Sequence, residues 1–179
     1  MICDHDSLDV KSNMAGCLES LGRRDAVVDM RREIYDQRVA VFGLSHEVSL
    51  AEAHRLALAL VNRLHDSQAE AKTFLRDIMP RARRFLGPHD TMYLRFRWTY
   101  AFALADDRTD GTLNDMIEAE KTYVEIEKIY TRRFGSEHPT TVTLREEISK
   151  VRGYIANVRD CATCKDPSCE WGAVARRSF

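Results

Sequence analysis

Residues that interrupt helices are scarce in this sequence, which has only four prolines and eight glycines among 179 residues. Helix-forming residues fill the stretches between them and predict a mainly helical chain. Long apolar runs are also missing, since the longest spans the six residues 56–61 and a membrane-crossing helix needs about 20. The acidic opening, MICDHDSLDV, lacks the apolar core of a signal peptide. These absences predict a cytoplasmic protein that does not act at a membrane.

The sequence also lacks an excess of either charge, and it lacks the common catalytic motifs. The net charge is −1, which gives none of the basic excess typical of nucleic-acid binding. The phosphate-binding, dinucleotide-binding, metalloprotease and serine-hydrolase motifs are all absent. The acidic loop at 106–111 only partly matches a calcium loop, because Arg108 and Ile117 stand where oxygen ligands are needed. We therefore expect no enzyme, no bound cofactor and no nucleic-acid partner.

A short pattern recurs along the chain. It occurs as DHDSL at 4–8, FGLSHEVSL at 42–50, LGPHDTM at 86–92 and FGSEHPTTV at 134–142. Each stretch has a histidine, later a Ser or Thr, and then an apolar residue. Those apolar residues are separated by 42, 42 and 50 positions, and they are Leu8, Leu50, Met92 and Val142. An internal period of this size indicates stacked helical repeats.

The recurring stretch predicts a joint between helices rather than a site. Gly43, Gly87 and Gly135 follow long helical runs and suit the left-handed position that ends a helix. The hydroxyls expected to cap the following helices are those of Ser7, Ser49, Thr91 and either Thr140 or Thr141. Each histidine is expected to pack and hydrogen-bond across its turn. A row of metal-binding or proton-relay histidines is the less favoured alternative, because successive turns would lie along an edge.

Each period divides into two amphipathic helices. The predicted helices are 8–21 and 25–42, 50–64 and 69–86, 92–105 and 113–134, with a last one at 142–158. Pro80 predicts a kinked or split helix. Met14, Leu56, Trp98 and Ile148 fall at equivalent positions, of which Leu56 and Trp98 are expected to be largely buried. The fold class is therefore an all-α solenoid of about three helix pairs.

The turn pattern, the period of 42 residues and the two-helix unit resemble the tetratricopeptide (TPR) repeats of the kinesin light chain type. The resemblance covers about residues 4–158, within a repeat domain placed at 1–158. Its units are 4–46, 47–89 and 90–138, followed by a capping helix at 142–158 that has no partner after it. The family implies a right-handed superhelix whose concave face, lined by the first helix of each pair, binds peptides or partner proteins.

Placed on the family's groove, the repeat alignment gives a candidate binding surface. Asn13, Arg55 and Arg97 occupy one equivalent position in successive first helices. The neighbouring groove residues are His54, Leu58 and Asn62 in the second repeat, and Phe96 and Tyr100 in the third. Guanidinium groups beside aromatic side chains suit a peptide or protein with acidic residues. The alternative is that Arg55 and Arg97 pair with acids on adjacent helices and only hold the repeats together.

The remaining candidates are cysteines. Cys17 lies in a helix, where a buried thiol is expected. Cys161, Cys164 and Cys169 lie in the tail at 159–179, and a tetrahedral zinc site would need a fourth ligand that the local sequence lacks. A disordered or loosely packed tail without metal is the favoured interpretation. A metal site with a borrowed ligand and a redox-active pair remain alternatives, as does a structural subunit of a larger assembly.

Overall fold

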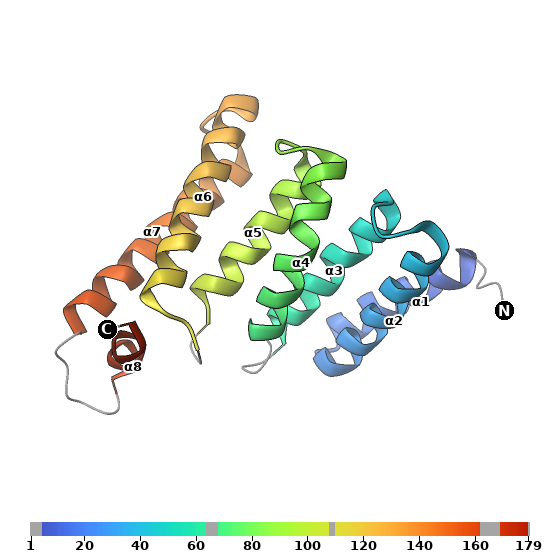
Figure 1. The fold of residues 1–179 in the computed structure, drawn as a ribbon, viewed down its shortest axis with the longest axis horizontal. Helices are drawn as coiled ribbons and strands as arrows, with labels where there is room; N and C mark the ends of the chain where they lie inside the picture. Colours follow the sequence, from blue (N-terminus) through green and yellow to red (C-terminus); the bar gives the residue numbers. More distant parts are fainter. Residues whose placement is uncertain (1–4, 64–67, 108–109, 162–168, 179) are drawn as a thin grey trace. The chain divides into compact units, whose positions relative to one another are not determined.

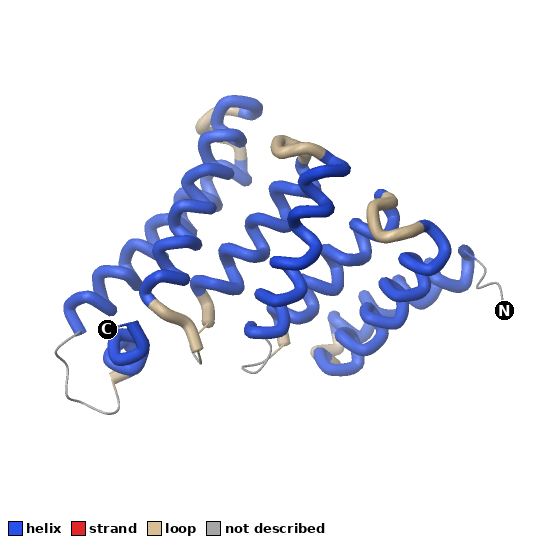
Figure 2. Tube along the Cα trace, in the orientation of Figure 1, coloured by secondary structure: helices blue, strands red, loops and turns tan. Residues whose placement is uncertain are grey.

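The computed structural model describes residues 5–63, 68–107, 110–161 and 169–178, and within these ranges the chain is all-helical (Figures 1 and 2). The helices are α1 (His5–Ser20), α2 (Arg24–Phe42), α3 (Glu47–Asn62), α4 (Gln68–Leu86), α5 (Thr91–Ala105), α6 (Leu113–Phe134), α7 (Pro139–Asp160) and α8 (Glu170–Ser178). The all-α prediction is confirmed for this part of the chain. No helix in it is long and apolar enough to cross a membrane.

The chain forms two compact units, Met1–Phe96 and Arg97–Phe179, whose boundary falls inside α5. In the first unit α1 packs on α2, α2 on α3 and α3 on α4. Its core is made of apolar side chains from these helices, including Leu8, Ala15, Ile34, Leu50, Leu56 and Leu75. In the second unit α6 packs on α7, and α8 contacts both. Its core includes Leu104, Ala119, Tyr123, Ile126, Leu144 and Val158.

The three joint glycines end helices as predicted. The amides of Gly43, Gly87 and Gly135 donate to carbonyls four residues earlier, at 2.8, 2.9 and 3.0 Å respectively. Their φ angles are 85°, 92° and 91°. At Gly43 and Gly135 ψ is 163° and 169°, so this backbone lies in an extended positive-φ region that is essentially restricted to glycine. A side chain at these positions would be strained, which explains why each helix stops there.

The residues that cap the following helices differ from those predicted. Nδ1 of His46 accepts a hydrogen bond from the Val48 amide at 3.2 Å, and Nδ1 of His138 accepts one from the Thr140 amide at 3.2 Å. At the third joint Oδ1 of Asp90 accepts from the Met92 amide at 2.7 Å. The predicted hydroxyl caps are therefore wrong for α3, α5 and α7. For Ser7, the structure describes only the backbone.

At two joints the hydroxyl instead donates to a backbone carbonyl earlier in the chain. Ser49 donates to the Arg38 carbonyl at 3.2 Å, and Thr141 donates to the Gly135 carbonyl at 3.0 Å. The histidine rings pack on the preceding helix, with centroids 4.9 Å apart for Phe42 and His46 and 4.9 Å for Phe134 and His138. These two histidines therefore pack and hydrogen-bond within their turns, as expected.

Several burial and boundary predictions need correction. Leu56 is buried and most of the Trp98 surface is buried, as predicted, but Met14 is exposed at its equivalent position. Cys17 is exposed rather than buried. Pro80 lies inside a continuous α4, so the split-helix alternative is wrong. The predicted break at 65–67 lies outside the described residues.

The interpretation of residues 159–179 as a loosely packed tail is wrong for the part that the structure describes. Residues 170–178 form α8, in which Val174 and Ala175 are buried. Trp171 stacks on Tyr154 of α7 with ring centroids 5.0 Å apart. The Ser178 hydroxyl accepts a 2.7 Å hydrogen bond from the Leu113 amide and so caps the start of α6. The last predicted helix therefore does have a partner after it.

Candidate functional site

The predicted groove residues of the first unit divide into exposed and buried ones. Arg55, Leu58 and Asn62 are exposed on α3 at spacings of three and four residues, so they lie on one face of the helix. Asn13 is exposed on α1. Leu56 and Leu60, which face inward on the same helix, are each 1% exposed. α3 thus presents a stripe with a cation, an apolar side chain and an amide.

Two of the predicted binding residues belong to the core instead. Phe96 has no exposed surface, and Tyr100 is 6% exposed. Phe96 meets the edge of the His54 ring with centroids 5.4 Å apart, while the Tyr100 hydroxyl donates to Oε1 of Glu118 at 3.1 Å. A partner cannot contact such aromatic rings on a surface. Their assignment to a peptide-binding face is therefore corrected to a packing role.

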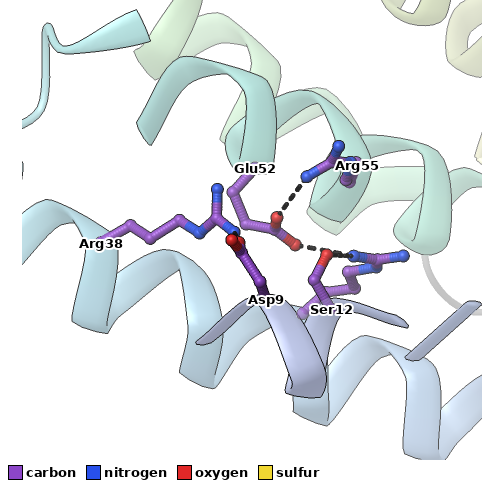
Figure 3. Close-up of polar contacts among 6 residues, drawn as sticks. Asp9, Ser12, Arg38, Glu52 and Arg55 are labelled. Carbon is purple, nitrogen blue, oxygen red and sulfur yellow. Dashed lines mark hydrogen bonds and ion pairs between the residues drawn. The ribbon is translucent and has the colours of Figure 1, made fainter. Parts of the chain in front are cut away.

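Arg55 is held by a buried carboxylate on its own helix (Figure 3). Glu52 is fully buried, and its Oε2 accepts a 3.0 Å contact from Arg55. Its Oε1 accepts a 3.0 Å contact from Arg31 of α2, whose guanidinium also donates to the Ser12 hydroxyl at 2.8 Å. Two guanidinium groups thus compensate one carboxylate. This cluster joins α1, α2 and α3 and fixes where Arg55 reaches the surface.

A second ion pair lies beside it. Arg38 of α2 is buried, and its guanidinium donates to Oδ1 of Asp9 in α1 at 2.8 Å (Figure 3). The Arg38 carbonyl also accepts the Ser49 hydroxyl from α3. Arg31 and Arg38 are seven residues apart and so share one face of α2. This face of α2 therefore forms polar contacts with both α1 and α3, in the geometry of structural ion pairs.

Arg97, in the second unit, forms an ion pair with Glu125 of α6. Its side chain is 17% exposed, whereas that of Glu125 is 63% exposed. Arg97 therefore pairs with an acid on an adjacent helix, as the alternative interpretation predicts. Arg55 and Arg97 lie in different units.

His54 is the predicted site residue with the strongest electrostatic perturbation. Burial lowers the pKa of its imidazole to about 4, and the nearby positive charge of Arg95 acts in the same direction. A partner carboxylate therefore meets a neutral ring at neutral pH. This argues for a packing role of His54 against Phe96 rather than a cationic one.

The low pKa of His54 predicts a loss of stability in mild acid. The unfolded chain binds a proton near pH 6.5 and the folded chain only near pH 4, so the stabilisation is complete above pH 6.5 and is lost as the pH falls toward 4. Between pH 7 and pH 4 we expect the free energy of unfolding of the His54→Gln variant to fall by about 2–3 kcal/mol less than that of the parent. Urea unfolding at pH 7.0, 5.5 and 4.0 measures the difference. Parallel pH profiles for the two proteins would show that His54 titrates normally.

The cysteine candidates are placed only in part. Cys161 ends α7, and Cys169 precedes α8, with their Sγ atoms 3.7 Å apart. The amide of Gly172 also donates to Sγ of Cys169 at 3.3 Å. Cys164 lies outside the described residues. The described residues contain no group of three or more side chains that could hold a metal ion.

Sequence reasoning missed Glu52. A glutamate inside an apolar helix is ordinarily expected to face solvent, and nothing local marks it as buried. The available signal was helical spacing, which places Glu52 four residues before Leu56 and so on the same face of the helix. Comparison with known proteins adds no assignment, because no family model and no curated protein matches this chain.

Proposed function

We propose that this chain is a non-enzymatic protein-binding scaffold whose exposed α3 stripe binds an acidic peptide or protein segment. The observation that carries the proposal is that Arg55, Leu58 and Asn62 stay exposed on a helix whose other faces are buried. Arg55 projects a guanidinium already oriented by Glu52. Leu58 is 38% exposed beside it and offers apolar contact. This combination suits a ligand in which a carboxylate lies next to an apolar side chain.

The finer architecture belongs to the same proposal. The joint pattern and the resemblance to kinesin light chain-type TPR repeats support a right-handed solenoid of about three helix pairs. In that family the first helix of each pair lines the concave face, and Asn13, Arg55 and Arg97 would mark equivalent positions along it. We further propose a cytoplasmic location, and protein partners rather than nucleic acid or membrane.

A peptide-display selection on the purified protein tests this function. We expect enriched sequences to combine an acidic with an apolar residue, and the Arg55→Ala/Leu58→Ala double variant to bind them about 10- to 100-fold more weakly. Arg81→Ala is the matched control, because Arg81 is similarly exposed on α4 and pairs with Asp77 one turn away. Its affinity should be unchanged.

Thermal melts must accompany the binding measurements, because Arg55 also contacts Glu52. The proposal requires that the double variant melts close to the parent while it loses affinity. A folded double variant that retains full affinity would remove the α3 stripe from the binding surface. A variant that loses affinity only in proportion to its unfolding would assign Arg55 to the structural cluster.

A structural subunit of a larger assembly is the second candidate. One observation favours it: Val10 and Met14 of α1 are 66% and 52% exposed, and Leu21, which directly follows the helix, is 73% exposed. Val10 and Met14 are four residues apart and so lie on one face of the helix. An apolar helix face of this kind suits burial against another protein. Native mass measurement at micromolar concentration separates a self-assembling subunit from a monomeric scaffold.

A further inference from the structure

The end of α7 and the start of α8 bring two thiols together. The Sγ atoms of Cys161 and Cys169 are 3.7 Å apart, whereas a disulfide holds them at about 2.05 Å. The sulfurs therefore need to approach by less than the width of one atom. Seven residues, 162–168, separate the two cysteines in the chain, so the bond would close a short loop.

Both thiols sit at fixed points of the second unit. Cys161 is the residue that ends α7, and its amide donates to the carbonyls of Asn157 and Arg159. Cys169 is held against the first turn of α8 by the amide of Gly172. A Cβ atom at Gly172 would lie 3.3 Å from Cβ of Cys169, which is a tight contact. Glycine at this position thus lets the Cys169 side chain lie close to the helix.

α8 depends on such attachments because it is short. It has nine residues, and isolated helices of fewer than about 12 are marginal in water. At its far end it is joined to the loop before α6 and to the start of α6, through Ser178 and through Arg177, which donates to the Gly111 carbonyl at 3.2 Å (Figure 1). At its near end Trp171 stacks on Tyr154 of α7, and the thiol pair joins the residue before α8 to the residue that ends α7. A covalent bond there would secure both ends of α8.

We propose that Cys161 and Cys169 form a reversible disulfide that fastens α8 to the end of α7. A small-molecule disulfide such as glutathione disulfide is the oxidant. One cysteine thiolate attacks it and releases one glutathione thiol, which leaves a mixed disulfide on the protein. The second thiolate attacks the protein sulfur of that mixed disulfide and releases the second glutathione. The two cysteines lose two electrons and two protons, which reduce the oxidant to two thiols.

This pairing differs from the Cys161–Cys164 pair that the C-x-x-C spacing indicates. Trypsin distinguishes them, because cleavage after Arg159, Lys165 and Arg176 gives the peptides 160–165 and 166–176. A Cys161–Cys169 bond links these two peptides, whereas a Cys161–Cys164 bond stays within the first. The Cys164→Ser variant removes the remaining pairing, Cys164 with Cys169, which would also link them.

The experiment oxidises the full chain carrying Cys3→Ser, Cys17→Ser and Cys164→Ser with glutathione disulfide, so that only the two proposed thiols remain. We expect non-reducing peptide mapping to find the linked peptides, and dithiothreitol to release them. Amides of α8 should exchange about tenfold more slowly in the oxidised protein than in the reduced one. The same background with Cys169→Ser is the control, because its hydroxyl can still accept from Gly172 and it forms no intramolecular bond.

Three results would overturn the proposal. The first is that the linked peptides do not form while the wild-type chain gives the internal Cys161–Cys164 bond. The second is a linked protein in which exchange of the α8 amides is unchanged, which would show that the bond does not fasten the helix. The third is protection of the thiols from oxidation until a chelator removes zinc, which would assign them to a metal site.

Discussion

Replacing Glu52 with alanine should lower the free energy of unfolding by about 3–5 kcal/mol. The Glu52 side chain has no exposed surface, and it is the carboxylate that Arg31 contacts. The side chain of Arg31 is itself only 8% exposed. Removing the carboxylate therefore leaves a buried guanidinium that has lost its counter-charge and donates to the Ser12 hydroxyl. Urea unfolding followed by circular dichroism measures the loss.

Glu70→Ala provides the matched control. Glu70 also contacts two arginines, Arg32 and Arg63, but its side chain is 40% exposed. Exposed pairs of this kind contribute about 0–1 kcal/mol, so the control variant should unfold almost as the parent does. A double variant, Arg31→Met with Glu52→Leu, should recover most of the stability lost in Glu52→Ala, because it removes both members of the buried pair and leaves neither charge uncompensated. Equal losses for Glu52→Ala and Glu70→Ala would contradict the burial of this cluster.

The helix ends at the joints were accessible from the sequence because two local signals agree there, whereas α3 and α7 begin at Glu47 and Pro139, three residues before their predicted starts. Apolar periodicity places the helices, and a glycine, which readily adopts a positive φ, marks each end, as at Gly43 and Gly135. α6 was predicted at 113–134 and lies at Leu113–Phe134. Both signals are properties of a few neighbouring residues and therefore need no knowledge of the tertiary fold.

The choice of capping group was not accessible in the same way. Each joint offers a histidine or aspartate and one or two hydroxyls within a few positions, and any of them can accept from a free amide. His138 takes the cap because its ring also packs on Phe134. The Thr141 hydroxyl is then available to the Gly135 carbonyl. Several side chains at the joint can accept a hydrogen bond from the free amides equally well. The packing of the histidine ring determines which of them caps the helix.

Burial on the candidate surface also depended on partners distant in the sequence. Helical spacing puts Phe96 and Tyr100 on one face with Arg97 beside them, and it cannot tell whether another helix covers that face. Tyr100 is buried, and its hydroxyl donates to Glu118, 18 residues later in the chain. α8 escaped prediction for the same reason, since its attachments reach back 65 and 66 residues to Leu113 and Gly111.

Tyr123 should respond in opposite directions to two substitutions. Its ring is fully buried and meets Trp98 edge-on with ring centroids 6.5 Å apart, while its buried hydroxyl has no hydrogen-bond partner among the described residues. Tyr123→Ala removes the ring and should cost about 3–5 kcal/mol, as for other large aromatics in cores. Tyr123→Phe removes only the unsatisfied hydroxyl, so stability at pH 7 should stay the same or rise by about 1 kcal/mol. Urea unfolding at pH 7 measures both.

The hydroxyl also makes a pH-dependent prediction. Burial raises the pKa of Tyr123 well above its ordinary value of 10.0, and the negative charges of Glu147 and Asp106 add to this. The contribution of the neutral phenol is complete below pH 10 and is lost as the pH rises beyond it, so Tyr123→Phe should lose less stability than the parent between pH 9 and pH 11. Tyr100→Phe is the control, since it removes a hydroxyl that donates to Glu118 and should cost about 1–2 kcal/mol at pH 7. Equal losses for the two phenylalanine variants would show that the Tyr123 hydroxyl has a partner.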